Sequence, residues 1–320
     1  MLLPGPRTLF WSLVLGLAIT GLAVTAQATT VISPVLEISG GPGDTREGVL
    51  KLYNETDTTL GLQAVVEVFS DQESGDPLPD SAFLNWISLA YTNITLEPNQ
   101  IGLIPFTVEF PTTATPGGYY ATVFWEQRPD SFLSGAVGIQ SRVGHVLLLT
   151  VEGELSSELS LQQFQIGAGN SVTGFPIRFT TELLNTGNVH LQPTGTITIT
   201  NWLGQVAQLR LNRQERYLLP QHSRQFELLW GEPENQNGWQ RFLAGVRQEI
   251  NVLPFGKHQA RLDVRYGPAL EAQEFSTQLV FWFFPYRLLG IIFGTVIFLI
   301  LLLFGGRRRR NSHRAHAKSA

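Results

Sequence analysis

The sequence contains no cysteine in 320 residues, so no disulfide bond can stabilise the protein. Its fold must therefore be held by the packing of apolar side chains. The same absence excludes thiol nucleophiles and cysteine-ligated metal centres. The four histidines away from the chain ends are isolated, with no pair at the spacing of zinc ligands: His145, His190, His222 and His258. We therefore expect no metal site built on histidine and no cofactor.

Catalytic motifs are lacking as well. The chain has no Gly-x-Ser-x-Gly, Ser-x-x-Lys or Walker pattern. Gly167-Ala-Gly169 lacks the third glycine and the following helix of a dinucleotide-binding site, so it is interpreted as a turn. Because no nucleophile, acid pair or metal set emerges, we predict that the protein is not an enzyme.

Positive charge is scarce in the long middle part of the chain. Residues 29–284 hold all 26 acidic residues but only 14 of the 22 basic ones, which gives this part a net charge of −12. Binding of phosphate polymers requires clustered cations. The composition therefore argues against nucleic acid as a partner.

The middle part also lacks a sustained helical period, and short strand patterns take its place. The clearest one is Leu60–Phe69, where aliphatic residues alternate over ten positions and predict a strand with one buried face. Such strands recur with turn signals between them, which is typical of all-β sandwiches. The other expected strands are 31–38, 46–53, 83–89, 104–110, 119–126, 139–151, 175–184, 194–200, 225–230, 256–266 and 274–281.

An internal repeat divides this part in two. Each half has a strand that ends in asparagine, at Asn54 and at Asn185, and later a Leu-x-Pro turn, at Leu96–Pro98 and at Leu218–Pro220. We predict two tandem Ig-like β-sandwich domains, 29–155 and 156–284, so the fold class is all-β with one C-terminal transmembrane helix.

The C-terminal end predicts a membrane span. Residues 288–304 carry no charge and are almost all apolar, and a helix of this length reaches about 25 Å, close to the thickness of the hydrocarbon core. We assign 285–305 to the transmembrane helix and 306–320 to a basic cytoplasmic tail that contacts membrane lipid. The membrane-interface residues are the aromatic and basic ones at its two ends: Trp282, Tyr286, Arg307, Arg308, Arg309 and Arg310.

The N-terminal end has the pattern of a secretory signal. A basic residue, Arg7, precedes an apolar run at 9–24, and an Ala-x-Ala site predicts cleavage after Ala28. Residues 1–28 are then a signal peptide, and the chain is a type I, single-pass protein of the cell membrane whose bulk is extracytoplasmic. A retained N-terminal anchor is the alternative. No cysteine follows the apolar run, which excludes a lipoprotein.

Three segments are candidates for binding. Asp71, Glu73 and Asp76 lie on a glycine-containing loop whose oxygen ligands suit calcium, although the spacing is not that of a twelve-residue calcium loop and a solvated acidic loop is the alternative. The aromatic run Tyr119–Trp125 offers a stacking platform for sugars or, because a strand alternates its faces, core residues. Gly231–Glu249 is a long connection. It is interpreted either as a functional loop or as a segment that packs on the sandwich.

The plan of the chain resembles a known family. Pro116–Ala121 and Arg142–Val151, together with the asparagine-ended strands and Leu-x-Pro turns, are similar to Ig-like domains of bacterial surface proteins. A signal peptide, two such domains, one membrane helix and a short basic tail resemble the WxL-interacting proteins of Gram-positive envelopes. The resemblance implies a binding role in the cell envelope, with the first domain associated with peptidoglycan.

These observations predict a cell-envelope protein whose outer domains bind or scaffold a surface protein or a wall polymer. Two alternatives remain open. The first is an assembly factor like the periplasmic pilus chaperones, which capture a partner strand at an exposed sheet edge. The second is a signalling input that acts through the basic tail.

Overall fold

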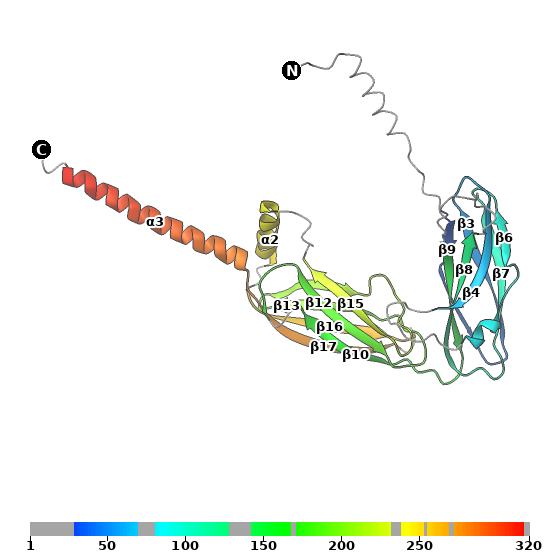
Figure 1. Ribbon diagram of the computed structural model, residues 1–320. Helices are drawn as coiled ribbons and strands as arrows, with labels where there is room; N and C mark the ends of the chain where they lie inside the picture. Colours follow the sequence, from blue (N-terminus) through cyan, green and yellow to red (C-terminus); the bar gives the residue numbers. More distant parts are fainter. Residues whose placement is uncertain are drawn as a thin grey trace, which may run out of the picture. The chain divides into compact units, whose positions relative to one another are not determined.

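The protein is described from a computed structural model (Figure 1). It describes residues 29–69, 81–127, 142–167, 171–231, 238–252, 255–268 and 272–316. The chain divides into two compact units, unit 1 (Met1–Gly153) and unit 2 (Glu154–Ala320). Each is a β-sandwich with its own apolar core.

Unit 1 consists of two sheets. One has the order β1 (Thr29–Ile32), β3 (Thr45–Asn54), β7 (Ile101–Glu109) and β5 (Ile87–Leu89). The other has the order β2 (Val35–Gly40), β9 (Arg142–Val151), β8 (Gly117–Gln127), β4 (Leu60–Val68) and β6 (Asn93–Leu96). All neighbours are antiparallel except β2 and β9, which are parallel.

Unit 2 repeats this arrangement. Its smaller sheet has the order β10 (Leu159–Ile166), β12 (Ile177–Asn185) and β15 (Ser223–Trp230). The larger has the order β11 (Ser171–Val172), β17 (Gln273–Phe283), β16 (Gly256–Tyr266), β13 (Thr194–Asn201) and β14 (Gly204–Leu211). Here β11 runs parallel to β17, as β2 does to β9. In each unit, two facing sheets with this strand pairing form an Ig-like β-sandwich, which confirms the predicted fold class.

The strand expected at 31–38 is in fact two strands in different sheets. β1 pairs with β3, and β2 pairs with β9. The break lies at Ser33, which has a positive φ of 57°, and at Pro34, which has no N–H to donate to a ladder. The chain therefore crosses from one sheet to the other at this point. The strand expected at 83–89 is likewise shorter, because a 3₁₀ helix (Ala82–Trp86) precedes β5.

The alternating pattern at Leu60–Phe69 predicts the core of unit 1 correctly. Leu60 and Leu62 are buried, and Ala64, Val66 and Val68 pack against the buried cluster. Each buried aliphatic side chain contributes about 1.5–3 kcal/mol.

The internal repeat has a physical basis in two buried asparagines. Nδ2 of Asn54 donates to the carbonyl oxygen of Leu96 at 3.1 Å, and Nδ2 of Asn185 donates to that of Leu218 at 2.9 Å. Both asparagines are fully buried. The backbone N–H after each Leu-x-Pro turn, that of Asn99 or Gln221, returns a hydrogen bond to the asparagine carbonyl.

In both turns this last residue has a left-handed conformation, with φ of 59° at Asn99 and 61° at Gln221. We name each arrangement an asparagine corner. Because buried backbone carbonyls need partners, the corner fixes the turn to the end of the preceding strand.

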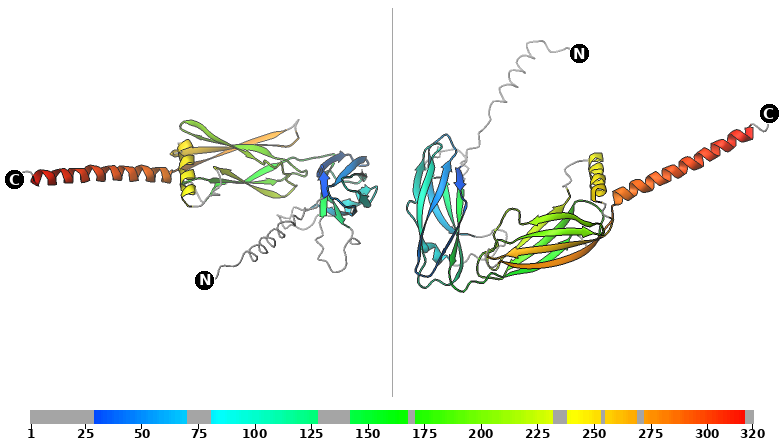
Figure 2. Two further views of the ribbon diagram at one scale, coloured as in Figure 1. Left: turned by 90° about the horizontal axis from the view of Figure 1, so that it is seen from above. Right: turned by 180° about the vertical axis from the view of Figure 1, so that it is seen from behind.

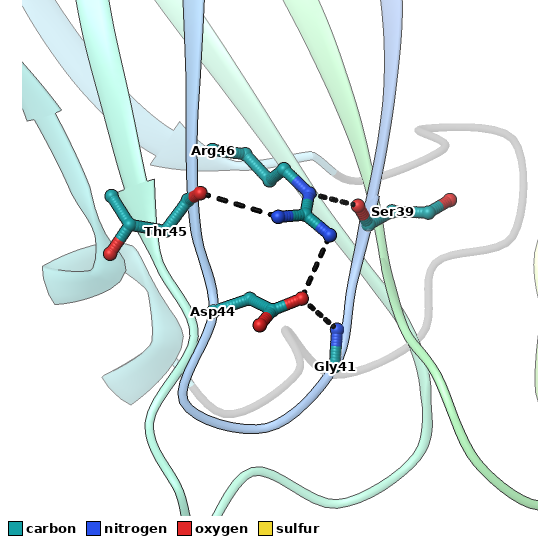
Figure 3. Close-up of polar contacts among 5 residues, drawn as sticks. All are labelled: Ser39, Gly41, Asp44, Thr45 and Arg46. Atoms are coloured by element: carbon teal, nitrogen blue, oxygen red, sulfur yellow. Dashed lines mark hydrogen bonds and ion pairs between the residues drawn. The ribbon is translucent and has the colours of Figure 1, made fainter.

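Another polar cluster fixes the turn between β2 and β3 (Figure 3). Oδ2 of Asp44 accepts from the N–H of Gly41 at 2.9 Å and from Nη2 of Arg46 at 2.8 Å. Nε of Arg46 donates to the carbonyl oxygen of Ser39 at 3.0 Å. The cluster satisfies its own charges, so its role is to hold the turn.

Two helices belong to unit 2. α2 (Trp239–Val252) lies between β15 and β16, where a connection without helical period is expected from the sequence; that expectation is wrong. α3 (Tyr286–His316) begins directly after Pro285, a residue suited to the first turn of a helix. Within α3, residues Tyr286–Phe304 are long and apolar enough to cross a membrane.

Candidate functional site

A cleft lies between the free edges of the two sheets of unit 2. β14 is the last strand of the larger sheet, and β15 is the last strand of the smaller one, among the strands that the structure describes. The cleft measures about 530 Å³ and is lined by residues from both strands and their connection. Residues 224–229 of β15 line it without interruption, so its length follows the strand edge.

Four arginines line this cleft, which we name the arginine cleft. Arg210 lies near the end of β14, and Arg224 lies near the start of β15. Arg213 and Arg216 lie on the connection between these two strands. Arg210, Arg213 and Arg216 are exposed, and within the described ranges none of them has a carboxylate at ion-pair distance. Glu227 also lines the cleft but is bound to Arg178 at 2.6 Å.

A buried asparagine shapes the connection that carries two of these arginines. Asn212 has a left-handed backbone with φ of 48° and is 8% exposed. Its Nδ2 donates to the carbonyl oxygens of Pro193 and Arg216, both at 2.9 Å, and its Oδ1 accepts from the N–H of Arg216 at 2.9 Å. The turn is therefore held from inside, and Arg213 and Arg216 are displayed on a fixed backbone.

A second cleft of about 590 Å³ adjoins the first and shares Arg210 and Arg213 with it. Its other arginines are already paired, Arg261 with Asp263 at 2.8 Å and Arg265 with Glu274. Among the described residues that line the two clefts, Arg210, Arg213 and Arg216 thus have no carboxylate at ion-pair distance.

Charge differs strongly between the two units. Residues 29–153 carry 15 acidic and 4 basic residues, a net charge of −11, whereas residues 154–284 carry 11 acidic and 10 basic residues, a net charge of −1. In unit 1, Arg46 is held by Asp44, and Arg142 lies 3.4 Å from Glu67. The negative charge of residues 29–284 is thus borne almost entirely by unit 1, and most of the cations lie in unit 2.

The histidines are placed apart. His145 is fully buried in unit 1, where its Nδ1 accepts from Nε1 of Trp125 at 3.3 Å and its Nε2 lies 3.2 Å from the carbonyl oxygen of Lys51. His258 is buried in unit 2, where its Nδ1 donates to the carbonyl oxygen of Gly256 at 3.1 Å. Burial lowers the pKa of both side chains, and the backbone hydrogen bonds oppose this in part.

His190 and His222 lie elsewhere in unit 2, and no three His, Asp or Glu side chains come together among the described residues. The calcium candidates Asp71, Glu73 and Asp76, and the cleavage site Ala28, lie outside the described residues, so these predictions stay predictions.

The predicted membrane-interface residues lie at the base of α3. Trp282 is 48% exposed at the end of β17, and Tyr286 is 52% exposed at the start of α3. The backbone of α3 includes Arg307, Arg308, Arg309 and Arg310.

The aromatic run in β8 forms no platform. Trp125 is 1% exposed and belongs to the core of unit 1. Phe124 points to the other face, where the guanidinium of Arg142 lies 3.9 Å from its ring centroid. Tyr119 packs against Phe83 and Trp86. The alternative prediction, that alternation places such residues in the core, holds for Trp125.

Sequence reasoning missed the arginine cleft. The spacing of three between Arg210, Arg213 and Arg216 was the local signal for it. The contribution of Arg224 depends on the facing of β14 and β15.

No family model and no curated protein matches the chain. Solved structures of chaperones are similar to it at low identity. The class 5 fimbriae chaperone CfaA is 10% identical, with 79% of this chain and 99% of that chain covered and a TM-score of 0.42. The YadV chaperone is 10% identical, with 78% of this chain and 99% of that chain covered and a TM-score of 0.40. The E. coli chaperone DraB is 15% identical over 79% and 98%, with a TM-score of 0.37. At these values the functions of those proteins are not transferred to this chain, and the resemblance to WxL-interacting proteins stays a prediction.

Proposed function

We propose that this chain is a single-pass membrane protein whose unit 2 holds an acidic, extended segment of a partner protein in the arginine cleft, outside the membrane. The observation that carries the proposal is the cleft itself, about 530 Å³ in volume and lined by four arginines. Guanidinium groups bind carboxylates through two parallel hydrogen bonds. The arginines on the connection stand on a backbone already fixed by Asn212, which lowers the entropic cost of binding.

Two features of the cleft favour a polypeptide over a wall polysaccharide. The cleft follows the length of β15, so an extended chain can lie along it. Among the described residues that line it, the one aromatic residue is Phe226, which is 9% exposed. Sugar rings bind well on exposed aromatic faces, and the described lining offers none.

The membrane part of the proposal is supported by α3. Residues Tyr286–Phe304 have a mean hydropathy of 2.6, and only 6% of that window is buried in the structure. A core helix of a soluble protein would bury such a surface. The basic residues that follow this segment in the sequence support a cytoplasmic tail, as the positive-inside rule expects.

Site-specific photocrosslinking of the full chain in its native membrane tests the proposal. Leu229 lines the cleft and is 40% exposed, so a benzophenone amino acid at this position should capture a defined protein. The double variant Arg213→Gln/Arg216→Gln should lose most of the crosslinked product. The double variant Arg46→Gln/Arg142→Gln removes the same amount of charge from unit 1, and the crosslinked product should be retained.

Equal crosslinking in both double variants would overturn the proposal, as would a product composed of glycan without protein. A crosslinked product that decreases steeply with added salt would support charge-mediated binding, because exposed charges are screened within about 8 Å at physiological ionic strength.

A second candidate is an assembly factor that captures a strand of its partner. The free edge of β15 along the cleft favours it, because β12 occupies only the other edge. Strand addition would protect the β15 amides from hydrogen exchange when the partner is bound. Binding through the arginine side chains alone would leave their exchange unchanged.

A further inference from the structure

One end of unit 2 exposes large apolar side chains from three separate elements. They are Trp202 (76% exposed) and Leu203 (56%) in the β13–β14 turn, Trp239 (70%), Leu243 (49%) and Ile250 (50%) on α2, and Phe255 (56%), Trp282 (48%) and Phe284 (37%) around the end of β17. We name this set the apolar end. Of the four tryptophans in unit 2, the remaining one, Trp230, is 6% exposed. All the exposed tryptophans of unit 2 thus belong to this set.

Strand register brings these elements to the same end. Thr200, next to the β13–β14 turn, pairs with Gln259, and Lys257 pairs with Trp282. The turn therefore lies beside the last residues of β17, from which the chain continues into α3. Figures 1 and 2 show α2 at this same end, beside the start of α3.

α2 is fixed to the first turn of α3. Oε2 of Glu249, a fully buried residue, accepts from the N–H of Leu288 at 2.8 Å. This carboxylate satisfies a backbone donor at the positive end of the α3 dipole. Gly245, one turn earlier on α2, lies under Arg287, and a β-carbon there would overlap the guanidinium group.

The orientation of α2 follows from these contacts. It runs across the axis of α3 (Figure 2). Gln248 faces the sandwich, because a β-carbon on Gly231 would lie 3.1 Å from its Oε1. At about 100° per residue, the stripe of Trp239, Leu243 and Ile250 is centred about 160° from Gln248. The stripe is consequently exposed on the side of α2 opposite Gln248, where it borders the buried Val246.

The rim of the apolar end has the chemistry of a membrane interface. The rings of Phe284 and Trp282 stack with centroids 6.3 Å apart, and Phe255 meets Phe284 at 6.1 Å. Lys257, which pairs with Trp282, and Arg247 on α2 are both exposed and can reach anionic headgroups. Tryptophan, aliphatic and basic side chains on one amphipathic helix are typical of helices that lie in the plane of a bilayer surface.

We propose that α2 and the β13–β14 turn are inserted in the headgroup–acyl boundary of the membrane that α3 spans. The occupant of the apolar end is thus the lipid surface, which is continuous with the lipid around α3. This inference rests on the membrane span of the proposed function and extends it. Unit 2 is seated on the bilayer through three contacts, α3, α2 and the turn.

Spin labels test this seating, and the absence of cysteine makes every labelled site unique. Single cysteines replace Leu243, Trp202 and Trp282 in the full chain, reconstituted in nanodiscs of phosphatidylcholine and phosphatidylglycerol. Ser276→Cys is the matched aqueous control, since Ser276 lies on β17 with the same exposed face as Trp282, six residues and about 20 Å away. Phe298→Cys reports on the middle of the span.

Relaxation by oxygen, relative to a water-soluble nickel chelate, measures depth in the bilayer. We expect this ratio to be severalfold higher at Leu243→Cys, Trp202→Cys and Trp282→Cys than at Ser276→Cys, and highest at Phe298→Cys. If the labels at Leu243→Cys and Trp202→Cys gave the same ratio as Ser276→Cys while Phe298→Cys kept a high ratio, the seating would be overturned but the membrane span would stand. A water-exposed Phe298→Cys would overturn the span itself.

Discussion

Unit 1 and unit 2 share a scaffold and differ in what is attached to it. In both, the second strand (β2 or β11) runs parallel to the last one (β9 or β17), and an asparagine corner joins a strand end to a Leu-x-Pro turn. Unit 1 has a net charge of −11, whereas unit 2 is nearly neutral and carries the arginine cleft, α2 and α3.

The difference separates stability from function within one architecture. Features present in both units satisfy buried backbone groups and build the cores. Features present only in unit 2 leave Arg210, Arg213 and Arg216 without a carboxylate at ion-pair distance among the described residues and expose large apolar side chains. Such groups are the usual mark of binding. Three pairs of matched substitutions sharpen this comparison.

The asparagine corners should give the largest effects. Asn54→Ala removes side-chain hydrogen bonds to the carbonyl oxygens of Thr58, Leu96 and Glu97 and also those from Thr56. Asn185→Ala removes those to two carbonyl oxygens and one from an N–H group. We expect losses of about 4 kcal/mol in unit 1 and about 3 kcal/mol in unit 2, because buried unsatisfied groups cost about 1–3 kcal/mol each.

Urea titration of the full chain in detergent, followed by hydrogen exchange resolved by unit, measures both losses. Asn93→Ala is the control, since Asn93 is exposed and, among the described residues, its side chain bonds only to neighbouring Thr92. The free energy of unfolding of Asn93→Ala should change by less than about 0.5 kcal/mol. If Asn54→Ala behaved like this control, the corner would not be a source of stability.

The buried histidines should give a smaller effect that depends on pH. The pKa of both His145 and His258 is lowered by burial, so near pH 6 the unfolded chain binds protons that the folded units do not. Stability should be complete above about pH 6.5 and should fall as the pH decreases toward the folded pKa, by at most about 1.4 kcal/mol per pH unit for each histidine.

The two histidines should nevertheless differ on replacement. His145→Phe should abolish the pH dependence of unit 1 between pH 5.5 and 7.5 and also lower its stability at pH 7.5, because His145 is bonded at both nitrogens. His258→Phe should abolish the pH dependence of unit 2 and lower its stability at pH 7.5 only slightly. The reason is that Nε2 of His258 has no hydrogen-bond partner in the described chain, and its ring stacks on Phe281. Urea midpoints at the two pH values check this. A pH dependence that persists in both variants would assign it to other groups.

The surface ion pairs should give the smallest effects. Arg178→Ala removes one exposed pair in unit 2 and should cost less than about 0.5 kcal/mol. Arg142→Ala removes contacts to Glu67 and Glu126 and the contact with the Phe124 ring, so about 1 kcal/mol is expected in unit 1. Urea midpoints of each variant and of the unsubstituted chain, measured in 0.05 M and 0.5 M salt, check this. A loss in Arg142→Ala that is the same at both salt concentrations would indicate that the ring contact, and not the ion pairs, is its source.

The sequence was informative wherever local pattern decides structure. Alternation over Leu60–Phe69 predicts β4, and the repeated asparagines predict two like domains. The helix α2 was missed although Trp239, Phe242, Val246 and Ile250 recur at helical spacing, because Gly245 interrupts a short segment that resembles a loop. Gly245 is required by Arg287, a residue more than forty positions away, and no local pattern contains that contact.

The arginine cleft was missed for a similar reason. Its two edges, β14 and β15, are not hydrogen-bonded to each other and face one another only because their sheets pack together. The sequence shows arginines, but the volume between them is a property of the sandwich.

The junction between β17 and α3 has a mechanical consequence. Only Phe284 and Pro285 separate the strand from the helix, and the hydrogen bond from Leu288 to Glu249 adds a second attachment beside the first. A chain held at two points cannot swivel about a single bond. Torque applied to α3 should therefore be transmitted to unit 2 as a rigid rotation, which makes the junction a stiff coupling and not a hinge.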